Sequence, residues 1–217
     1  MDLPQIGALG ELEQVLASFL RKNERVLLCF PGPWEPVGQT AAECVKRAGG
    51  VPVFWGGDLL WKSLLWNGFR HRCATVIGAP DILLGLSKLS RRAATPLYIR
   101  NAVILGDAPD DWLRSSICDG LDCKIRGWIP GAGHAAQPDG KVRELLRELR
   151  RWTTILDMKV EKTGPGLSLE LVTFPGEKLP KLPSFGRLVV RDWDADRDMP
   201  LDVPLQWKTG IFSQDDH

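Results

Sequence analysis

No apolar run in the sequence approaches the roughly 18 residues that a membrane-spanning helix requires. The N-terminal stretch MDLPQIGALGELEQ carries acidic residues and no basic segment, which is not the composition of a secretory signal peptide. The formal net charge is +1, so no strong basic field would draw the chain to nucleic acid. We therefore expect a cytoplasmic protein that has neither a membrane nor a nucleic acid among its partners.

Disulfide, zinc and phosphate-loop patterns are also missing. The five cysteines are an odd number, no CxxC pair occurs, and no histidine lies near Cys118 and Cys123 to complete a zinc site. Reduced thiols in a cytosolic protein are the simplest interpretation, and we expect no metal site. No glycine-rich phosphate loop of the GxxxxGK(S/T) or GxGxxG kind occurs.

The first two thirds of the sequence alternate between short apolar runs and amphipathic stretches. The apolar runs have strand length: RVLLCF, VPVFW, CATVIGA, NAVILG and LDCKIRGW. The segments between them have helical periodicity; one begins at Pro80, another ends before Gly49, and Asp58 is placed to cap a third. This order predicts right-handed crossovers and an α/β fold, in which a mostly parallel sheet is flanked by helices.

The composition changes after Gly127. A loop-like stretch rich in Gly and Pro precedes KVRELLRELRRWTTIL, which predicts an amphipathic helix over 141–156. Its arginines at 143, 147, 150 and 151 form either a solvated face or a docking surface. Strand-like runs around a turn at 164–166 predict a β-rich, antiparallel C-terminal segment. We expect an α/β subdomain over 1–135, and a helix plus β-rich segment over 136–217 packed on it as one globular unit.

Several short motifs occur in a fixed order. They are Ile77-Gly78-Ala79-Pro80-Asp81, Leu105-Gly106-Asp107-Ala108-Pro109, the strand-like Ser184-Phe185-Gly186-Arg187-Leu188-Val189-Val190, and the segment from Met199-Pro200-Leu201 to Thr209-Gly210. In this order they resemble motifs of the adenylate-forming (AMP-binding) superfamily, in particular of its phenylacetate–CoA ligase type. The resemblance covers roughly residues 24–212.

The resemblance implies two sets of binding residues. An adenine nucleotide would contact Gly106, Asp107, Ala108, Pro109, Gly127, Trp128 and Thr209, and a small carboxylic acid would contact Trp34, Gly78, Ala79 and Pro80.

Each set has a structural alternative that the sequence leaves open. Asp107 can belong to a helix N-cap region, and Gly78 with Pro80 can form a strand-to-helix turn. Trp34 can plug the end of the sheet, and Trp128 can fill a vacated cleft.

The departures from the family pattern concern its chemistry. Where the family has an aromatic-Gly-x-x-Glu motif that holds magnesium, this sequence reads RGWIP over 126–130, without a carboxylate. In PLQWKTGIF, Ile211 follows Thr209-Gly210 where the family has a ribose-binding Asp. The family's Ser/Thr/Gly-rich phosphate loop and its C-terminal domain with a catalytic Lys are not found. His71 and His134 have no evident nucleophile or carboxylate partner. We therefore expect no catalytic residue.

Two functional hypotheses follow from the resemblance and its departures. The first is a degenerate adenylation-like domain, non-catalytic on its own, that binds a small acid or a nucleotide or acts as a protein-interaction module. The alternative is an acyl- or aryl-CoA ligase-type enzyme, with ATP-dependent acid activation, that a partner subunit completes. Both imply a protein partner or a homo-oligomer.

Overall fold

The computed structural model describes residues 6–30, 36–56, 58–94, 96–106, 109–129, 140–163, 166–179 and 187–199. Strands and helices alternate along its first part, as the apolar runs predict. In chain order these elements are α1 (Ile6–Ala17), β1 (Arg25–Leu28), α2 (Pro36–Arg47), β2 (Val51–Phe54), α3 (Trp61–Arg70), β3 (Thr75–Gly78), α4 (Pro80–Arg92), β4 (Asn101–Leu105), α5 (Asp111–Leu121) and β5 (Lys124–Ile129).

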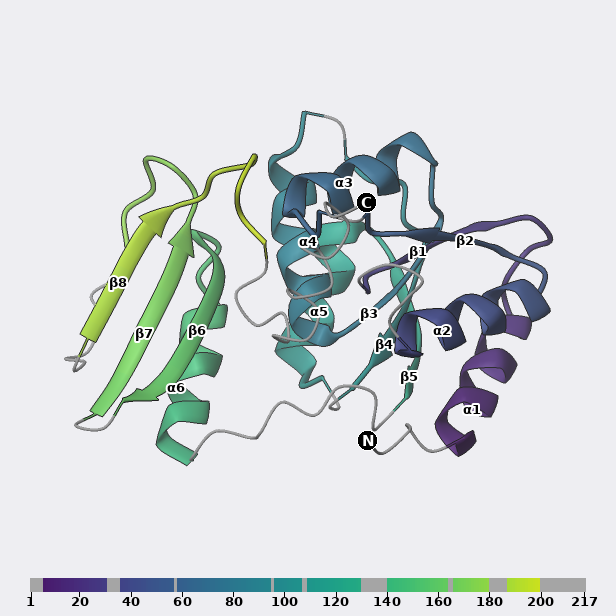
Figure 1. Ribbon diagram of the computed structural model, residues 1–217, viewed down its shortest axis with the longest axis horizontal. Coiled ribbons are helices and arrows are strands. Elements are labelled where there is room, and N and C mark those ends of the chain that lie inside the picture. The colour runs from purple at the N-terminus through teal and green to yellow at the C-terminus, as the bar shows by residue number, and fades with distance from the viewer. Residues whose placement is uncertain are drawn as a thin grey trace, which may run out of the picture.

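These five strands form one parallel sheet in the order β2-β1-β3-β4-β5 (Figure 1). The chain adds β2 on one side of β1 and then crosses to build β3, β4 and β5 on the other side. This reversal between β1 and β3 is a topological switch point, the place where open parallel sheets bind ligands. The predicted α/β fold with a parallel sheet flanked by helices is confirmed.

Helices cover both faces of this sheet, which explains the continuous apolar strands. Val26, Leu28 and Ile77 are buried in one cluster with residues of α1 and α2. Leu27 and Val76, which alternate with them along the strands, are buried in the cluster that includes residues of α3, α4 and α5. A strand buried on both faces needs apolar side chains at successive positions, so its sequence shows no alternation.

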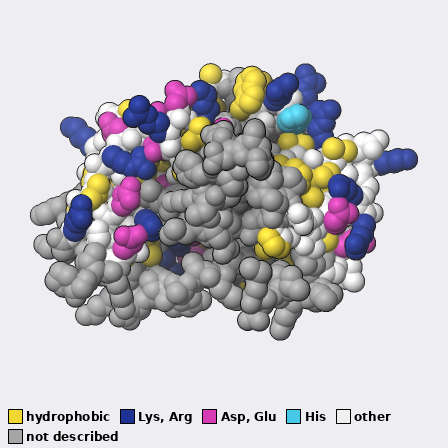
Figure 2. Space-filling view, viewed as in Figure 1, with side chains coloured by type: hydrophobic (Ala, Val, Ile, Leu, Met, Phe, Trp, Pro, Cys, Tyr) yellow, Lys and Arg dark blue, Asp and Glu magenta, His cyan; other side chains and the backbone are white. Residues whose placement is uncertain are grey.

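A second sheet contains β6 (Ile155–Thr163), β7 (Gly166–Thr173) and β8 (Arg187–Asp192), and α6 (Gly140–Arg150) packs against it (Figure 1). β6 and β7 form the predicted antiparallel pair, but β8 lies parallel to β7. The expectation of an antiparallel segment is therefore wrong for β8. In the sequence, 13 residues separate Thr173 from Arg187, which is enough for the connection that a parallel pair requires. Basic and acidic side chains intermingle over this part of the surface, on the left of Figure 2.

Two predicted helices have different bounds. α6 ends at Arg150 rather than near residue 156, because the N–H groups of Arg151 and Trp152 donate to carbonyls three residues back and tighten the last turn. α3 begins at Trp61, and Leu60 rather than Asp58 is its N-cap. The Asp58 carboxylate instead accepts hydrogen bonds from Leu60 N at 3.2 Å and Ser63 Oγ at 2.5 Å.

Two expectations from composition concern the cysteines and membrane-spanning helices. All five cysteines lie in the described ranges, and none of them forms a disulfide there. Among the described helices, none is long and apolar enough to cross a membrane.

Candidate ligand site at the carboxyl edge of the sheet

The carboxyl ends of β1, β3 and β4 meet at one edge of the sheet because the strands are parallel. Ala79 and Pro80 follow β3, and Gly106 follows β4. The structure therefore brings these members of the two predicted binding sets to a common edge, beside the β1/β3 switch point. We call this region the carboxyl-edge site.

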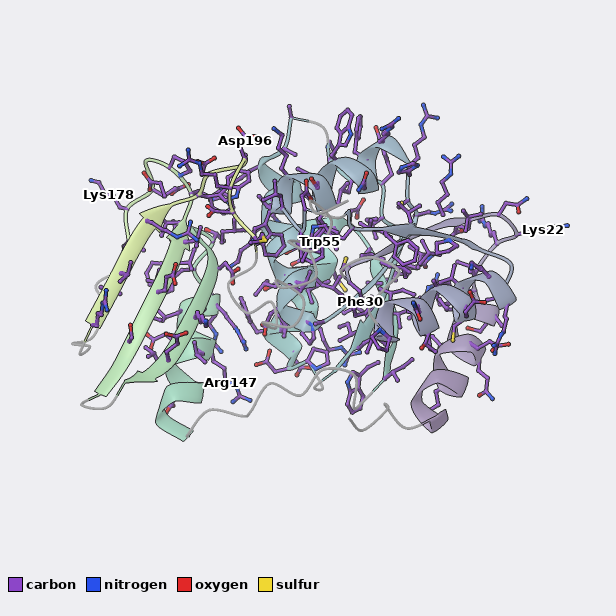
Figure 3. All side chains as sticks on the ribbon, viewed as in Figure 1. Lys22, Phe30, Trp55, Arg147, Lys178 and Asp196 are labelled. Atoms are coloured by element: carbon purple, nitrogen blue, oxygen red, sulfur yellow. The ribbon has the colours of Figure 1, made fainter. Side chains whose placement is uncertain are left out.

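Buried aromatic side chains fill the edge at β1 and β2. Phe30 follows β1 and Trp55 follows β2, and both lie inside the molecule (Figure 3). Trp55 Nε1 donates to the carbonyl of Leu60 at 2.8 Å, which satisfies its only polar atom. These two rings are core residues, so aromatic surface open to a ligand has to come from elsewhere on the edge.

Gly78 is explained by the close approach of two strands. A Cβ at this position would lie 2.7 Å from Cys29 Cβ and 3.2 Å from Leu83 Cδ2. These contacts favour the structural alternative for Gly78. Ala79 is the N-cap of α4 and Pro80 starts the helix, where its missing N–H costs nothing. Both are half-buried, and their place in a substrate pocket stays a prediction.

Gly106 and Trp128 form the most distinctive pair at this edge. Trp128 Nε1 donates to the Gly106 carbonyl at 2.7 Å, and Gly106 N donates to the Ile129 carbonyl at 3.0 Å. Gly106 has a φ of +128°, which other residues rarely adopt. The turn after β4 is therefore held on β5 at two points. Trp128 is 44% exposed, so it does not fill a closed cavity and instead presents a flat aromatic surface.

Gly127 is explained by α1. A Cβ at this position would lie 2.8 Å from Val15 Cγ1, so a larger residue would push α1 away from β5. Successive side chains of a strand point to opposite faces, so Trp128 points away from α1. A register shift between Ala102 and Val103 on β4 sets Ile104 opposite Trp128. No contact of Gly127 indicates a ligand.

Pro109 is half-buried and directly precedes Asp110, the N-cap of α5. Asp110 Oδ1 accepts a hydrogen bond from Leu113 N at 2.8 Å. Trp34, Asp107, Ala108 and Thr209, and the segment PLQWKTGIF, lie outside the described residues, so their roles stay predictions.

The described groups near this edge do not form a nucleophilic or metal centre. Burial raises the pKa of the Cys29 thiol well above its ordinary value, so the thiol stays protonated at neutral pH. No group of three His, Cys, Asp or Glu side chains within the described ranges is placed to hold a metal ion. His71 caps the C-terminus of α3, before β3 rather than after it. His134 lies outside the described residues.

The sequence analysis did not identify Lys88, a residue of α4 that connects the α/β part to the segment between α6 and β6. Lys88 lies on α4, is 6% exposed, and its Nζ donates to the carbonyls of Arg150, Trp152 and Ile155 at 3.1, 3.2 and 2.6 Å. Burial lowers its pKa to about 8. Its position could have been predicted from helical spacing, because Lys88 lies one turn after Leu84 and therefore on the same, buried face of α4.

The arginine face of α6 also contacts the α/β part. Arg150 Nη2 lies 2.8 Å from Asp81 Oδ2, and Arg147 Nε lies 3.9 Å from Asp110 Oδ2. These two side chains therefore face acids of α4 and the α5 N-terminus, rather than only solvent. The side chain of Arg143 lies outside the described residues.

No family model matches the sequence, and no curated protein is similar to it. Three solved structures have a similar arrangement, each at 12% identity. An open conformation of 2-hydroxyisobutyryl-CoA ligase in complex with 2-HIB-AMP and CoA has a TM-score of 0.45, over 54% of this chain and 27% of that one. IdnL1 has a TM-score of 0.41, over 85% and 64%. The amide bond synthetase McbA from Marinactinospora thermotolerans has a TM-score of 0.43, over 85% and 61%. This chain spans less than two thirds of each, and a likeness of this degree does not indicate a shared activity.

Proposed function

We propose that this chain is an adenylation-like domain that binds a small carboxylic acid or an adenine nucleotide at the carboxyl-edge site. The observation that carries the proposal is the 2.7 Å hydrogen bond from Trp128 Nε1 to the Gly106 carbonyl. It joins, across two strands, two of the motifs that the sequence resemblance assigns to the nucleotide.

The chemistry of this pair suits a planar ligand. A half-exposed indole offers an apolar face on which an adenine or an aryl acid can stack, worth about 1–3 kcal/mol for a base on an aromatic side chain. Gly106 itself is buried and both its N–H and its carbonyl are hydrogen-bonded to β5, so the indole face would supply the contact with the ligand. The carboxyl-edge site also includes the end of β3 at the switch point, where parallel sheets bind ligands, and the Gly106–Trp128 pair lies farther along the same edge on β4 and β5.

We further propose that this chain does not activate an acid on its own. Adenylation requires backbone N–H groups, a Lys and carboxylate-held Mg²⁺ to neutralise a triphosphate. The segment RGWIP has no carboxylate where the resembling motif has one, and Ile211 stands where it has an Asp. In the alternative, a ligase-type enzyme, a partner subunit would supply these groups.

Association with a protein partner or a second copy is part of both forms of the proposal. Leu188, Val189 and Val190 on β8 are 42, 37 and 40% exposed, and in the described part of the chain β8 pairs only with β7. An exposed apolar edge strand of this kind favours pairing with another chain. Light scattering after size exclusion measures the association, and a monomer at every concentration would argue against self-association.

The binding proposal is tested by calorimetric titration of the purified chain with AMP, ATP·Mg, CoA and benzoate. We expect AMP to bind, and Trp128→Leu to weaken it about tenfold through loss of stacking. Trp66→Leu is the matched control, because Trp66 is 55% exposed on α3 and belongs to neither binding set. Equal loss in both variants, or no heat with AMP, ATP·Mg or benzoate at millimolar concentration, would refute the proposal.

Catalysis is tested separately by ATP–pyrophosphate exchange. We expect no exchange from this chain alone. Exchange by the chain alone would refute the non-catalytic proposal, and exchange that appears only with a co-purified partner would support the partner-completed ligase.

A further inference from the structure

The opposite, amino edge of the five-stranded sheet carries a cleft that the proposed function does not use. Its volume is about 360 Å³, and we call it the basic cleft. Five of its lining residues are cations, Arg21, Lys22, Arg25, Arg72 and Arg100, and among its lining residues only Glu24 is acidic. Five positive charges less one negative charge leave a local charge of +4.

The backbone that carries these cations is held by hydrogen bonds between the strand starts. Val51 N donates to the Glu24 carbonyl at 2.8 Å, Ala74 N to the Arg25 carbonyl at 3.1 Å, and Arg100 N to the Ala74 carbonyl at 2.7 Å. The cations therefore lie at, or in the short turns before, strand starts that are hydrogen-bonded to one another, and not on a long loop. Ligand binding then requires only the side chains to become ordered.

Two residues that line the basic cleft, Glu24 and Arg100, belong to a polar network that continues into the protein. The Glu24 side chain is 5% exposed, and its two oxygens accept hydrogen bonds from Thr75 Oγ1 at 2.7 Å and Arg100 Nη2 at 3.1 Å. Asn101 Nδ2 lies 3.4 Å from Thr75 Oγ1, and Arg126 Nε donates to Asn101 Oδ1 at 2.7 Å. The one carboxylate is thus fully engaged, and it fixes the Arg100 guanidinium at the cleft.

Within the described part of the chain, three of the five cations of the basic cleft have no counter-charge. Arg21, Lys22 and Arg72 make no ion pair with any described residue. Arg25 Nη1 donates to the His71 carbonyl at 3.0 Å, a neutral acceptor. Basic side chains also gather near α3 at the upper right of Figure 2, with little acidic colour among them, and Lys22 points outward in Figure 3. Like charges held together repel, and a bound anion removes that cost.

We propose that the basic cleft binds the polyphosphate group of a small anion. Arginine forks bind phosphate oxygens through paired hydrogen bonds, and four of the five cations are arginines. The basic cleft is shallow and open to solvent, with a volume of about 360 Å³, which suits a compact charged group. An acidic protein segment would instead need a stripe of cations along an extended groove. This site is separate from the carboxyl-edge site and does not rest on the proposed function.

The test is calorimetric titration of the chain with tripolyphosphate, pyrophosphate and orthophosphate. We expect affinity to rise with the number of charges and to fall as salt is raised from about 50 to about 300 mM. Arg72→Gln, and the double variant Arg21→Gln with Lys22→Gln, should each weaken tripolyphosphate about tenfold, the loss expected for a charged hydrogen bond.

Matched controls remove the same charge elsewhere. Arg114→Gln, and Arg151→Gln with Lys178→Gln, change exposed side chains outside the basic cleft and should leave affinity within about twofold. Melting curves of all variants check that they are folded. Loss confined to the cleft variants would support the proposal. Equal loss in the controls, or no binding at millimolar tripolyphosphate, would overturn it.

Two further experiments distinguish the basic cleft from the carboxyl-edge site and a polyphosphate ligand from an acidic protein segment. Trp128→Leu should leave tripolyphosphate affinity unchanged, and Arg72→Gln should leave AMP affinity unchanged if AMP binds at the carboxyl edge. Failure of AMP to bind would thus leave this proposal standing. A polyglutamate peptide that competes as strongly as tripolyphosphate would contradict it and indicate an acidic protein partner.

Discussion

Replacing Lys88 with Met tests the junction between the two sheets. Methionine retains most of the aliphatic stem but removes the ammonium that donates to three carbonyls of the segment 150–155. The Trp152 carbonyl also accepts a hydrogen bond from Ile155 N, so it depends less on Lys88 than the Arg150 carbonyl does. Each buried carbonyl left without a hydrogen bond costs about 1–3 kcal/mol of stability. At a pH where the buried Lys88 amine is uncharged, Lys88→Met should therefore lower the free energy of unfolding by about 2–4 kcal/mol.

The loss should depend on pH, because the pKa of Lys88 is lowered from 10.5 to about 8 in the folded protein. Between these values the unfolded chain binds more protons, so the contribution of Lys88 to stability is fully present above the unfolded pKa and falls as pH drops through the folded pKa. A pKa shift of this size corresponds to about 3 kcal/mol of stability, and the free energy of unfolding should rise by about 2–3 kcal/mol of this between pH 7 and pH 10. Lys88→Met should therefore be nearly neutral at pH 7 and clearly destabilising at pH 10.

Urea unfolding followed by tryptophan fluorescence at several pH values from 7 to 10 measures this difference. The exposed Lys178→Met is the control, with an expected change within about 0.5 kcal/mol at every pH. Other titrating groups cancel in the difference between wild type and variant. A difference that does not change with pH would refute the assignment of Lys88 as a buried amine with a lowered pKa.

Three further predictions concern the α/β part. Gly78→Ala should destabilise the protein by about 1–3 kcal/mol in urea unfolding, because the new Cβ would meet Cys29 at 2.7 Å, whereas Gly10→Ala adds its Cβ in open space and should not destabilise. Asp110→Ala should cost about 1 kcal/mol by the same measurement through loss of the α5 cap, and no change would contradict its capping role. In native protein only Cys118 should react quickly with a thiol reagent such as DTNB, since the other four thiols are buried; a second fast thiol would show that one of them is accessible.

The α/β architecture could be predicted because its physical cause is local. Strands buried on both faces require successive apolar residues, and a helix start requires a residue such as Pro80, so both are visible in sequence. The parallel pairing of β8 and the end of α6 at Arg150 were not predictable. The pairing of β8 depends on which distant strand supplies its hydrogen bonds. The end of α6 depends on the tight last turn and on the contacts of its carbonyls with Lys88, and hydrophobic periodicity shows none of these.

The candidate site was predicted less completely. The resemblance named Gly106 and Trp128, but their hydrogen bond depends on a register shift in β4 that no motif shows. Gly78 and Gly127 look in sequence like points where a ligand approaches the backbone. In the structure, Cys29 and Val15 explain them, because close contact between elements requires a glycine just as a ligand does.

A nucleotide bound at the carboxyl-edge site should lie against the indole of Trp128. The most direct measurement is an NMR titration of the nine tryptophan indole N–H signals with AMP, with the Trp128 signal assigned by its absence in Trp128→Leu. We expect the Trp128 signal to shift saturably and more than that of Trp66. A Trp128 signal that stays unmoved at millimolar AMP would contradict it.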